Sequence, residues 1–190
     1  MIIRLRYGNT NTYFIDGLLI DTDMPGTLRG LFGELKKNGL AVKDIKYVLA
    51  THYHPDHMGL ISELMKLGVK LLLIDKQKGF VHFSDGIFER QKGLNYQPIL
   101  ENEATVISLA QSRDFLKTLG IDGEILPTES HSEDGIALVL DSGECFAGDL
   151  EPKSFIEAYD DNSELKKDWD KIITSGARII YSAHVNDQIL

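Results

Sequence analysis

The sequence predicts an α/β protein built from layers of sheet and helix, and three observations carry this prediction. Short apolar runs of strand length alternate with segments of helical periodicity along much of the 190 residues. Hydrophobic residues make up 43% of the chain, enough for one sizeable core. The sequence contains no fixed-period repeat, low-complexity tract or linker. We therefore expect one globular domain over residues 1–190.

β-Structure is expected first, at residues 2–7, 12–15 and 18–21, with Asp16-Gly17 as a tight turn between the last two strands. A helix over about residues 27–37 follows, ended by an Asn-Gly pair. Its apolar residues recur at helical spacing and share one face: Leu28, Leu31, Phe32 and Leu35.

The middle of the chain continues the alternation of strand and helix. Residues 45–50 are expected to form a buried strand that leads into a histidine-rich run. A helix ending near Gly68 and a strand over 70–74 should follow. Residues 80–103 are less regular and hold aromatic side chains, so they either cover a pocket or pack against outer helices. The remaining expected elements are helices over 112–119 and 163–175 and strands over 124–127, 136–140, 145–147 and 178–181.

Five of the six histidines occupy positions that suit a metal site. His52, His54 and His57 lie in one run, Thr51-His52-Tyr53-His54-Pro55-Asp56-His57. His131, His184 and Asp149 follow or end apolar runs further along the chain. Neutral imidazole and carboxylate are the usual ligands of zinc and similar divalent ions. His82 lies outside this pattern and is interpreted as an ordinary histidine.

The spacing within the run predicts two adjacent metal sites. On an extended segment, side chains two residues apart project to the same side, so His52 and His54 can share one ion. Asp56 and His57 follow at the turn toward the next helix and can reach a second ion. His131 could complete the first site and His184 the second, with Asp149 bridging the two ions. Such a pair can hold a hydroxide made from water whose pKa is lowered to about 7.

Together these motifs resemble a small member of the metallo-β-lactamase-fold hydrolase superfamily over nearly the whole length. Five segments carry the resemblance: Leu19-Ile20-Asp21-Thr22-Asp23, Thr51 to His57, Thr128-Glu129-Ser130-His131, Gly148-Asp149 and Ala183-His184. The resemblance implies an αββα sandwich of two mixed β-sheets flanked by helices, with metals at one edge. It also implies that Asp21 supports the ligand loop through hydrogen bonds and does not bind metal.

Two departures from the family pattern concern the pocket. The family often has glycine where this chain has Ser130, and its last motif often reads Gly-His-Gly where this chain has Ala183-His184-Val185. Because the ligands themselves are kept, these changes bear on the substrate more than on metal binding. Cys145, in an apolar strand, is expected to be a buried core residue.

Composition narrows the partners. The net charge of −9 disfavours nucleic acid and anionic membranes as partners. Within the resemblance, a small-molecule substrate is expected. A single cysteine excludes an intrachain disulfide, and neither a signal core nor a membrane-length apolar run is present, which predicts a cytoplasmic protein. The sequence leaves the oligomeric state open, with a homodimer as one option.

We therefore predict a metal-dependent hydrolase that uses a dinuclear-metal-bound hydroxide on a small ester, thioester, lactone or phosphodiester. Two divalent ions are expected, zinc first, with iron or manganese as alternatives. Asp56 is the expected catalytic group, steering water or passing a proton to the leaving group. Two other classes stay open: a mononuclear non-haem iron dioxygenase acting on a thiol-derived substrate, and a metal-binding sensor without turnover.

Overall fold

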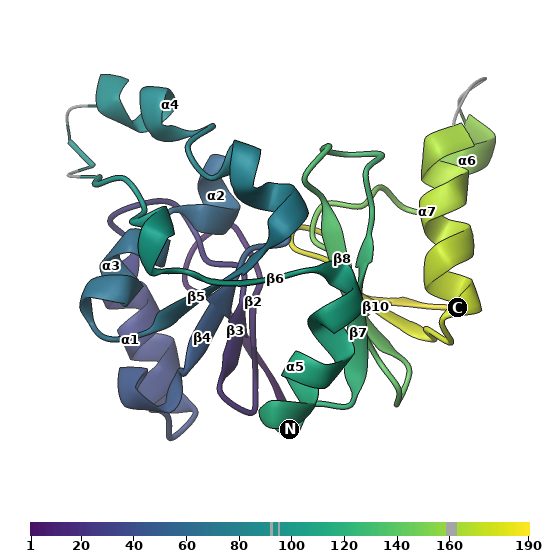
Figure 1. Cartoon of the computed structure of the whole chain (residues 1–190), viewed down its shortest axis with the longest axis horizontal. Coiled ribbons are helices and arrows are strands. Elements are labelled where there is room, and N and C mark those ends of the chain that lie inside the picture. Colours follow the sequence, from purple (N-terminus) through teal and green to yellow (C-terminus); the bar gives the residue numbers. More distant parts are fainter. Residues whose placement is uncertain (92, 95, 159–162) are drawn as a thin grey trace. The chain divides into compact units, whose positions relative to one another are not determined.

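Two mixed β-sheets and their helices make up the computed structural model, which describes residues 1–91, 93–94, 96–158 and 163–190 (Figure 1). The chain divides into two compact units, residues 1–108 and 109–190, and each unit contains one of the sheets. In Figure 1 the first unit runs from purple to teal and the second from green to yellow. The expectation of one domain over residues 1–190 stays a prediction.

The sheet of the first unit has six strands in sequence order, β1 to β6. The first three are antiparallel neighbours, and β3 to β6 are parallel. Asp16 and Gly17, in the β2–β3 turn, both have positive φ, 45° and 93°, as a tight hairpin turn requires. The strands are β1 (Ile2–Leu5), β2 (Thr12–Ile15), β3 (Leu18–Ile20), β4 (Tyr47–Leu49), β5 (Lys70–Ile74) and β6 (Thr105–Ile107).

Helices of the first unit bury apolar side chains against this sheet. Leu31 and Leu35 of α1 and Ile61 and Leu64 of α3 belong to one core cluster with alternating residues of the strands. The helical elements are α1 (Leu28–Lys37), α2 (Pro55–Met58), α3 (Ile61–Lys66) and α4 (Asp85–Arg90), with 3₁₀ turns η1 (Val42–Asp44), η2 (Asp75–Phe80) and η3 (Glu101–Glu103).

The second unit has a five-stranded sheet of order β11-β10-β9-β8-β7. Among the described strands of this unit, β9 and β10 pair in parallel and the other neighbours are antiparallel. Leu165, Trp169 and Ile172 of α7 pack with Ala137, Val139, Cys145 and Ile180 of the sheet in one core cluster. The elements are η4 (Leu109–Gln111), α5 (Ser112–Thr118), β7 (Gly123–Pro127), β8 (Ile136–Leu140), β9 (Glu144–Phe146), α6 (Phe155–Ala158), α7 (Ser163–Thr174), β10 (Ile179–Tyr181) and β11 (Gln188–Ile189).

Each strand and helix predicted from the sequence is present, with ends that differ by a few residues. The helix predicted to end near Gly68 is α3. One correction concerns Asp56 and His57, which were expected at a turn but lie in a separate short helix, α2, with Gly59 and Leu60 between the two helices. A Cβ on Gly59 would lie 2.4 Å from the carbonyl oxygen of Asp23, so only glycine allows the chain to approach so closely here.

The sequence did not predict β6, β11, α4, α6 or the 3₁₀ turns, all of which are short. In the described part of the chain, no helix is long and apolar enough to cross a membrane.

Candidate metal centre

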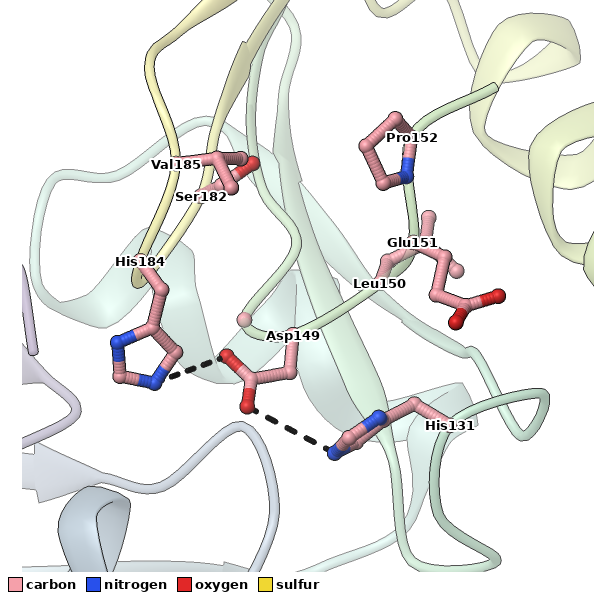
Figure 2. A pocket seen from close by; sticks show the side chains of 9 residues that line it. His131, Asp149, Leu150, Glu151, Pro152, Ser182, His184 and Val185 are labelled. Atoms are coloured by element: carbon pink, nitrogen blue, oxygen red, sulfur yellow. Dashed lines mark ion pairs between the residues drawn. The ribbon is translucent and has the colours of Figure 1, made fainter. Parts of the chain in front are cut away.

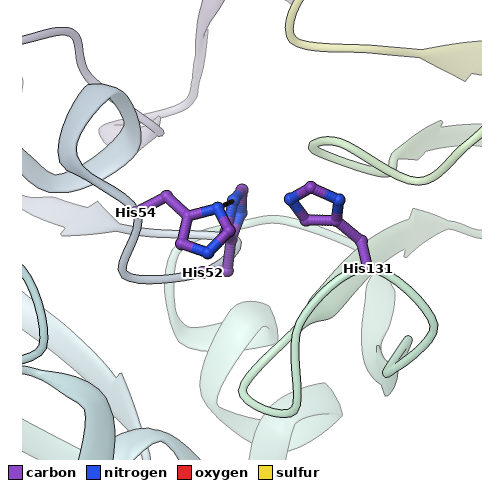
Figure 3. A group of neighbouring side chains, drawn as sticks. All are labelled: His52, His54 and His131. Atoms are coloured by element: carbon purple, nitrogen blue, oxygen red, sulfur yellow. Dashed lines mark hydrogen bonds between the residues drawn. The ribbon is translucent and has the colours of Figure 1, made fainter.

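The histidine run of the first unit follows β4 and enters α2. His54 is extended, with φ −71° and ψ 155°, and Pro55 begins the helix directly after it. His52 Nε2 lies 3.0 Å from His54 Nδ1, so the two rings meet on one side of the chain as their two-residue spacing predicts (Figure 3). Further along the run, Asp56 Oδ2 lies 3.9 Å from His57 Nε2.

Asp21 connects this run to the end of β3. Its φ of 57° is in the left-handed region, which non-glycine residues seldom adopt. Its backbone N–H donates to Leu49 O at 2.8 Å. Asp21 Oδ1 accepts a hydrogen bond from the backbone N–H of Thr51 at 2.7 Å, and Oδ2 accepts one from Thr51 Oγ1 at 2.9 Å. The same Oδ2 is 3.1 Å from His57 Nδ1.

These contacts set which ring nitrogens remain available. If His57 Nδ1–H donates to Asp21, then His57 Nε2 keeps its lone pair. Thr51 Oγ1 donates to Asp21 and lies 3.2 Å from His52 Nδ1, so it can accept from that nitrogen and leave His52 Nε2 as the ligand atom. One buried carboxylate therefore contacts His57 directly and reaches His52 through Thr51.

Side chains that the sequence did not single out also hold the run. Gln77, which is fully buried, donates from Nε2 to Ala50 O at 3.1 Å. Ser84 Oγ donates to Tyr53 O at 2.7 Å, and Thr10 Oγ1 donates to Asp56 O at 2.8 Å. No sequence pattern marks these three residues, because their role depends on contacts with distant parts of the unit.

Phe83 brings the segment 80–103 to the histidine run. Its ring centroid is 6.2 Å from that of His54, and 62% of the residue is exposed. Phe88 of the same segment is buried in the core, and its ring centroid lies 4.3 Å from that of Tyr96. The described residues of the segment thus combine core packing with one exposed aromatic ring beside a candidate ligand.

The second unit supplies a second ligand set, His131, Asp149 and His184. Figure 2 shows both imidazole rings facing the Asp149 carboxylate, one on each oxygen. His184 Nε2 is 3.4 Å from Oδ1, and His131 Nε2 is 3.7 Å from Oδ2. The three side chains line a cavity of about 240 Å³, whose other lining residues are Gly148, Leu150, Glu151, Pro152, Ser182 and Val185.

Local topology places these three side chains together. Asp149 and His184 follow β9 and β10, which are parallel neighbours, so both lie at the carboxyl ends of their strands. The backbone N–H of Ala183 donates to Gly148 O at 3.0 Å and keeps the two ends in register. His131 lies on the β7–β8 loop, where a Cβ on Gly135 would come within 2.0 Å of Thr128 O, so the loop closes only with glycine there.

The donor atoms suit a metal ion in both units. Ligand atoms that are 2.0–2.1 Å from a tetrahedral ion lie about 3.3–3.4 Å from one another. Within each unit, the spacings of neighbouring donors run from 3.0 to 3.9 Å, close to that value. All are imidazole nitrogens or carboxylate oxygens, which divalent transition metals bind. The residues therefore fit the metal chemistry that the sequence predicts.

Two nucleophilic side chains near the candidate ligands, Cys145 and Ser132, are poorly placed to react. Cys145 is fully buried, and burial raises the pKa of its thiol far above the usual value. Ser132 Oγ donates to Asp134 Oδ1.

Residues 5–184 match the metallo-β-lactamase superfamily, and the chain belongs to this family. It is 31% identical to a probable metallo-hydrolase of Methanocaldococcus jannaschii over 150 residues, 75% of this chain and 68% of that protein. It is 27% identical to a β-lactamase-like protein 2 homolog of Drosophila melanogaster over 93% of this chain, which spans only 59% of that relative.

Two solved structures share the fold. A metallo-β-lactamase family protein of Thermus thermophilus superimposes with a TM-score of 0.71 at 22% identity, covering 100% of this chain and 74% of the other. The protein TTHA1623, solved in a di-iron-bound form, gives 0.70 at 21% identity and covers 100% and 94%. These matches confirm the predicted fold class of two mixed sheets with helices, and the family supports a metal-dependent hydrolase.

Proposed function

We propose that this protein is a metal-dependent hydrolase that acts on a small molecule. The observation that carries the proposal is the arrangement of donors in each unit, where imidazole and carboxylate atoms converge at metal-ligand spacing. Membership of the metallo-β-lactamase superfamily and the named metallo-hydrolase relative support the same activity.

We assign the ligands to two ions, as the motif spacing predicts. His52, His54 and His131 hold one ion, Asp56, His57 and His184 hold the other, and Asp149 is shared. Both Asp149 oxygens already face a histidine nitrogen, which supports the shared role. Zinc is the first expectation for a site of imidazole and carboxylate donors. Iron is an alternative to zinc, because a structural relative was solved in a di-iron-bound form, and manganese is a second alternative.

When bound, such ions lower the pKa of a coordinated water to about 7 and polarise the scissile group. The chain supplies the positioning. The Asp56 side chain is 30% exposed, whereas the neighbouring His57 side chain is fully buried. Of these two side chains, Asp56 is therefore the one that a substrate can approach. Asp56 steers the water or passes a proton to the leaving group. The substrate is a small ester, thioester, lactone or phosphodiester.

Two other functions remain as alternatives: a mononuclear iron dioxygenase for a thiol-derived substrate and a metal sensor without turnover. We further propose a cytoplasmic protein that acts as one domain, as a monomer or homodimer, without nucleic-acid or membrane partners. These proposals rest on the charge and composition of the sequence.

Metal analysis combined with a substrate panel tests the proposal. Protein purified without chelator should contain about two ions per chain and should hydrolyse at least one generic ester, thioester, lactone or phosphodiester. One iron per chain together with oxygen consumption would favour the dioxygenase. Two ions without turnover on the panel would favour the sensor, and no binding of zinc, manganese or iron would refute a metal centre.

Intact-protein mass spectrometry after a rapid quench during turnover distinguishes direct attack by water from a covalent enzyme intermediate, because a trapped acyl or phosphoryl group adds its mass to the protein. We expect no added mass, because burial raises the pKa of the Cys145 thiol and Ser132 Oγ already donates to Asp134. An acyl or phosphoryl group trapped on Ser130, Ser132 or Cys145 would contradict this mechanism.

We propose that Phe83 contacts the apolar part of the substrate, since its exposed ring lies beside His54. Replacing Phe83 by alanine should raise KM about tenfold for the best apolar substrate of the panel, because partial burial of a phenyl ring is worth about 1.4 kcal/mol. Metal content should not change. Phe32→Ala is the matched control, since Phe32 is a 40% exposed phenylalanine on α1. Equal KM values for both variants would remove Phe83 from the substrate contact.

A further inference from the structure

The helix α7 makes direct contact with the loop that carries His131. The backbone N–H of Ser130, the residue directly before His131, donates to Asp168 Oδ2 at 2.8 Å. Asp168 lies in the middle of α7 and is 2% exposed. A hydrogen bond to a buried carboxylate is charge-assisted, and it restrains the backbone more strongly than a neutral hydrogen bond does.

Lys171 completes this contact from the next turn of the helix. Its Nζ lies 2.9 Å from Asp168 Oδ1 and donates to Pro127 O at 3.1 Å. Both Asp168 oxygens are therefore engaged, and the lysine balances the buried negative charge. Through these two side chains, α7 holds the backbone at the end of β7 and again just before His131.

The same turn of α7 also reaches the strand end that carries Asp149. Trp169 is buried in the core cluster of the unit, and its Nε1–H donates to Glu151 O at 2.9 Å. Glu151 lies two residues beyond Asp149. Three contacts from one helix thus fix the backbone beside two candidate ligands.

The arrangement repeats the one around Asp21 in the first unit. There the backbone N–H of Thr51, directly before His52, donates to a buried aspartate at 2.7 Å. Here Ser130, directly before His131, makes the same contact with Asp168. In both units, a buried carboxylate from a distant segment holds the residue that precedes a histidine ligand.

We propose that Asp168 is a positioning residue for metal binding, acting through the backbone of Ser130, with Lys171 and Trp169 as its partners on α7. This inference rests on the proposed metal centre. It adds a set of residues outside all five motifs, and it makes the metal affinity depend on how α7 packs against the β7–β8 loop.

Metal affinity measured by competition with a chelator tests this role, with zinc as the probe. Asp168→Ala should weaken binding of one of the two ions by about 10–100-fold, the range typical for groups that orient a ligand. Asp168→Asn should lose less, because its amide oxygen can still accept from Ser130 N–H. The visible spectrum of the cobalt-substituted protein should change in Asp168→Ala, because the His131 ligand shifts.

Asp170→Asn is the matched control on the same helix. Asp170 is exposed and pairs with Lys166 at 2.7 Å, so its loss should leave zinc affinity and the cobalt spectrum unchanged.

Melting temperatures of the metal-free proteins separate a positioning role of Asp168 from a role in stability. If Asp168→Ala lowers the melting temperature but binds zinc as the unchanged protein does, Asp168 is structural only and the proposal is wrong. If Asp168→Ala does not fold, Asp168→Asn, which weakens the charge-assisted hydrogen bond from Ser130 N–H, decides: unchanged zinc affinity and an unchanged cobalt spectrum refute the proposal. Failure of the unchanged protein to bind any metal would instead refute the proposed function itself.

Discussion

Asp149→Ala is expected to lose at least one of the two ions and to reduce activity by more than about 100-fold. This loss exceeds the range of about 10–100-fold that is typical of residues that only orient a metal ligand. Two divalent ions about 4 Å apart repel each other by about 4 kcal/mol even at the dielectric constant of water. The Asp149 carboxylate offsets this repulsion, and its two oxygens each face one histidine, at 3.4 and 3.7 Å. Its removal therefore affects both ions together.

Metal content per chain and turnover on the best panel substrate measure this effect. Glu151→Ala serves as the control, because Glu151 is an exposed acid two residues away that lines the same cavity. That variant removes the same charge but no proposed ligand, so it should keep two ions. Equal metal loss in both variants would show that the net charge of the cavity matters and that the shared carboxylate does not.

The ligand run could be predicted because its spacing is a local property of the chain. His52 and His54 are two residues apart, a spacing that favours projection to the same side, and their Nε2 and Nδ1 atoms lie 3.0 Å apart. The same holds for the Asp16-Gly17 turn, where the dipeptide itself favours positive φ. Features that depend on a few neighbouring residues were therefore accessible to sequence reasoning.

The groups that hold the ligands could not be predicted, because they come from distant segments. Asp168 stands in the charged stretch Ser163-Glu164-Leu165-Lys166-Lys167-Asp168, which is typical of a solvated helix face, yet it is 2% exposed and contacts Ser130, 38 residues earlier. Gln77 likewise reaches back to Ala50. The strand β11 has only two residues, too few to show an alternating pattern.

Asp21→Asn is expected to have the second largest effect. It should reduce metal affinity and activity by about 10–100-fold, less than Asp149→Ala does. Asparagine tolerates the left-handed φ of 57° at this position, so the substitution removes the charge without straining the backbone. Its amide oxygen can still accept from Thr51 N–H. The amide nitrogen, however, is a donor, and it cannot accept from Thr51 Oγ1–H or His57 Nδ1–H.

The physical reason for the loss is the tautomer of His57. With a donor facing Nδ1, the ring favours the form with its proton on Nε2, the nitrogen that we assign to the metal. Asp23→Asn is the matched control, because Asp23 is equally buried, and among the described residues its carboxylate accepts hydrogen bonds from Thr10 and Met24 N–H. Asp23→Asn should lower the melting temperature of the metal-free protein but weaken zinc binding less than Asp21→Asn does, because Asp23 reaches the ligand run indirectly, through Thr10, whose Oγ1 donates to Asp56 O. If Asp21→Asn bound zinc as tightly as Asp23→Asn, Asp21 would stabilise the fold without orienting a ligand. If Asp21→Asn lost both ions while Asp149→Ala kept both, the roles assigned to Asp21 and Asp149 would have to be exchanged.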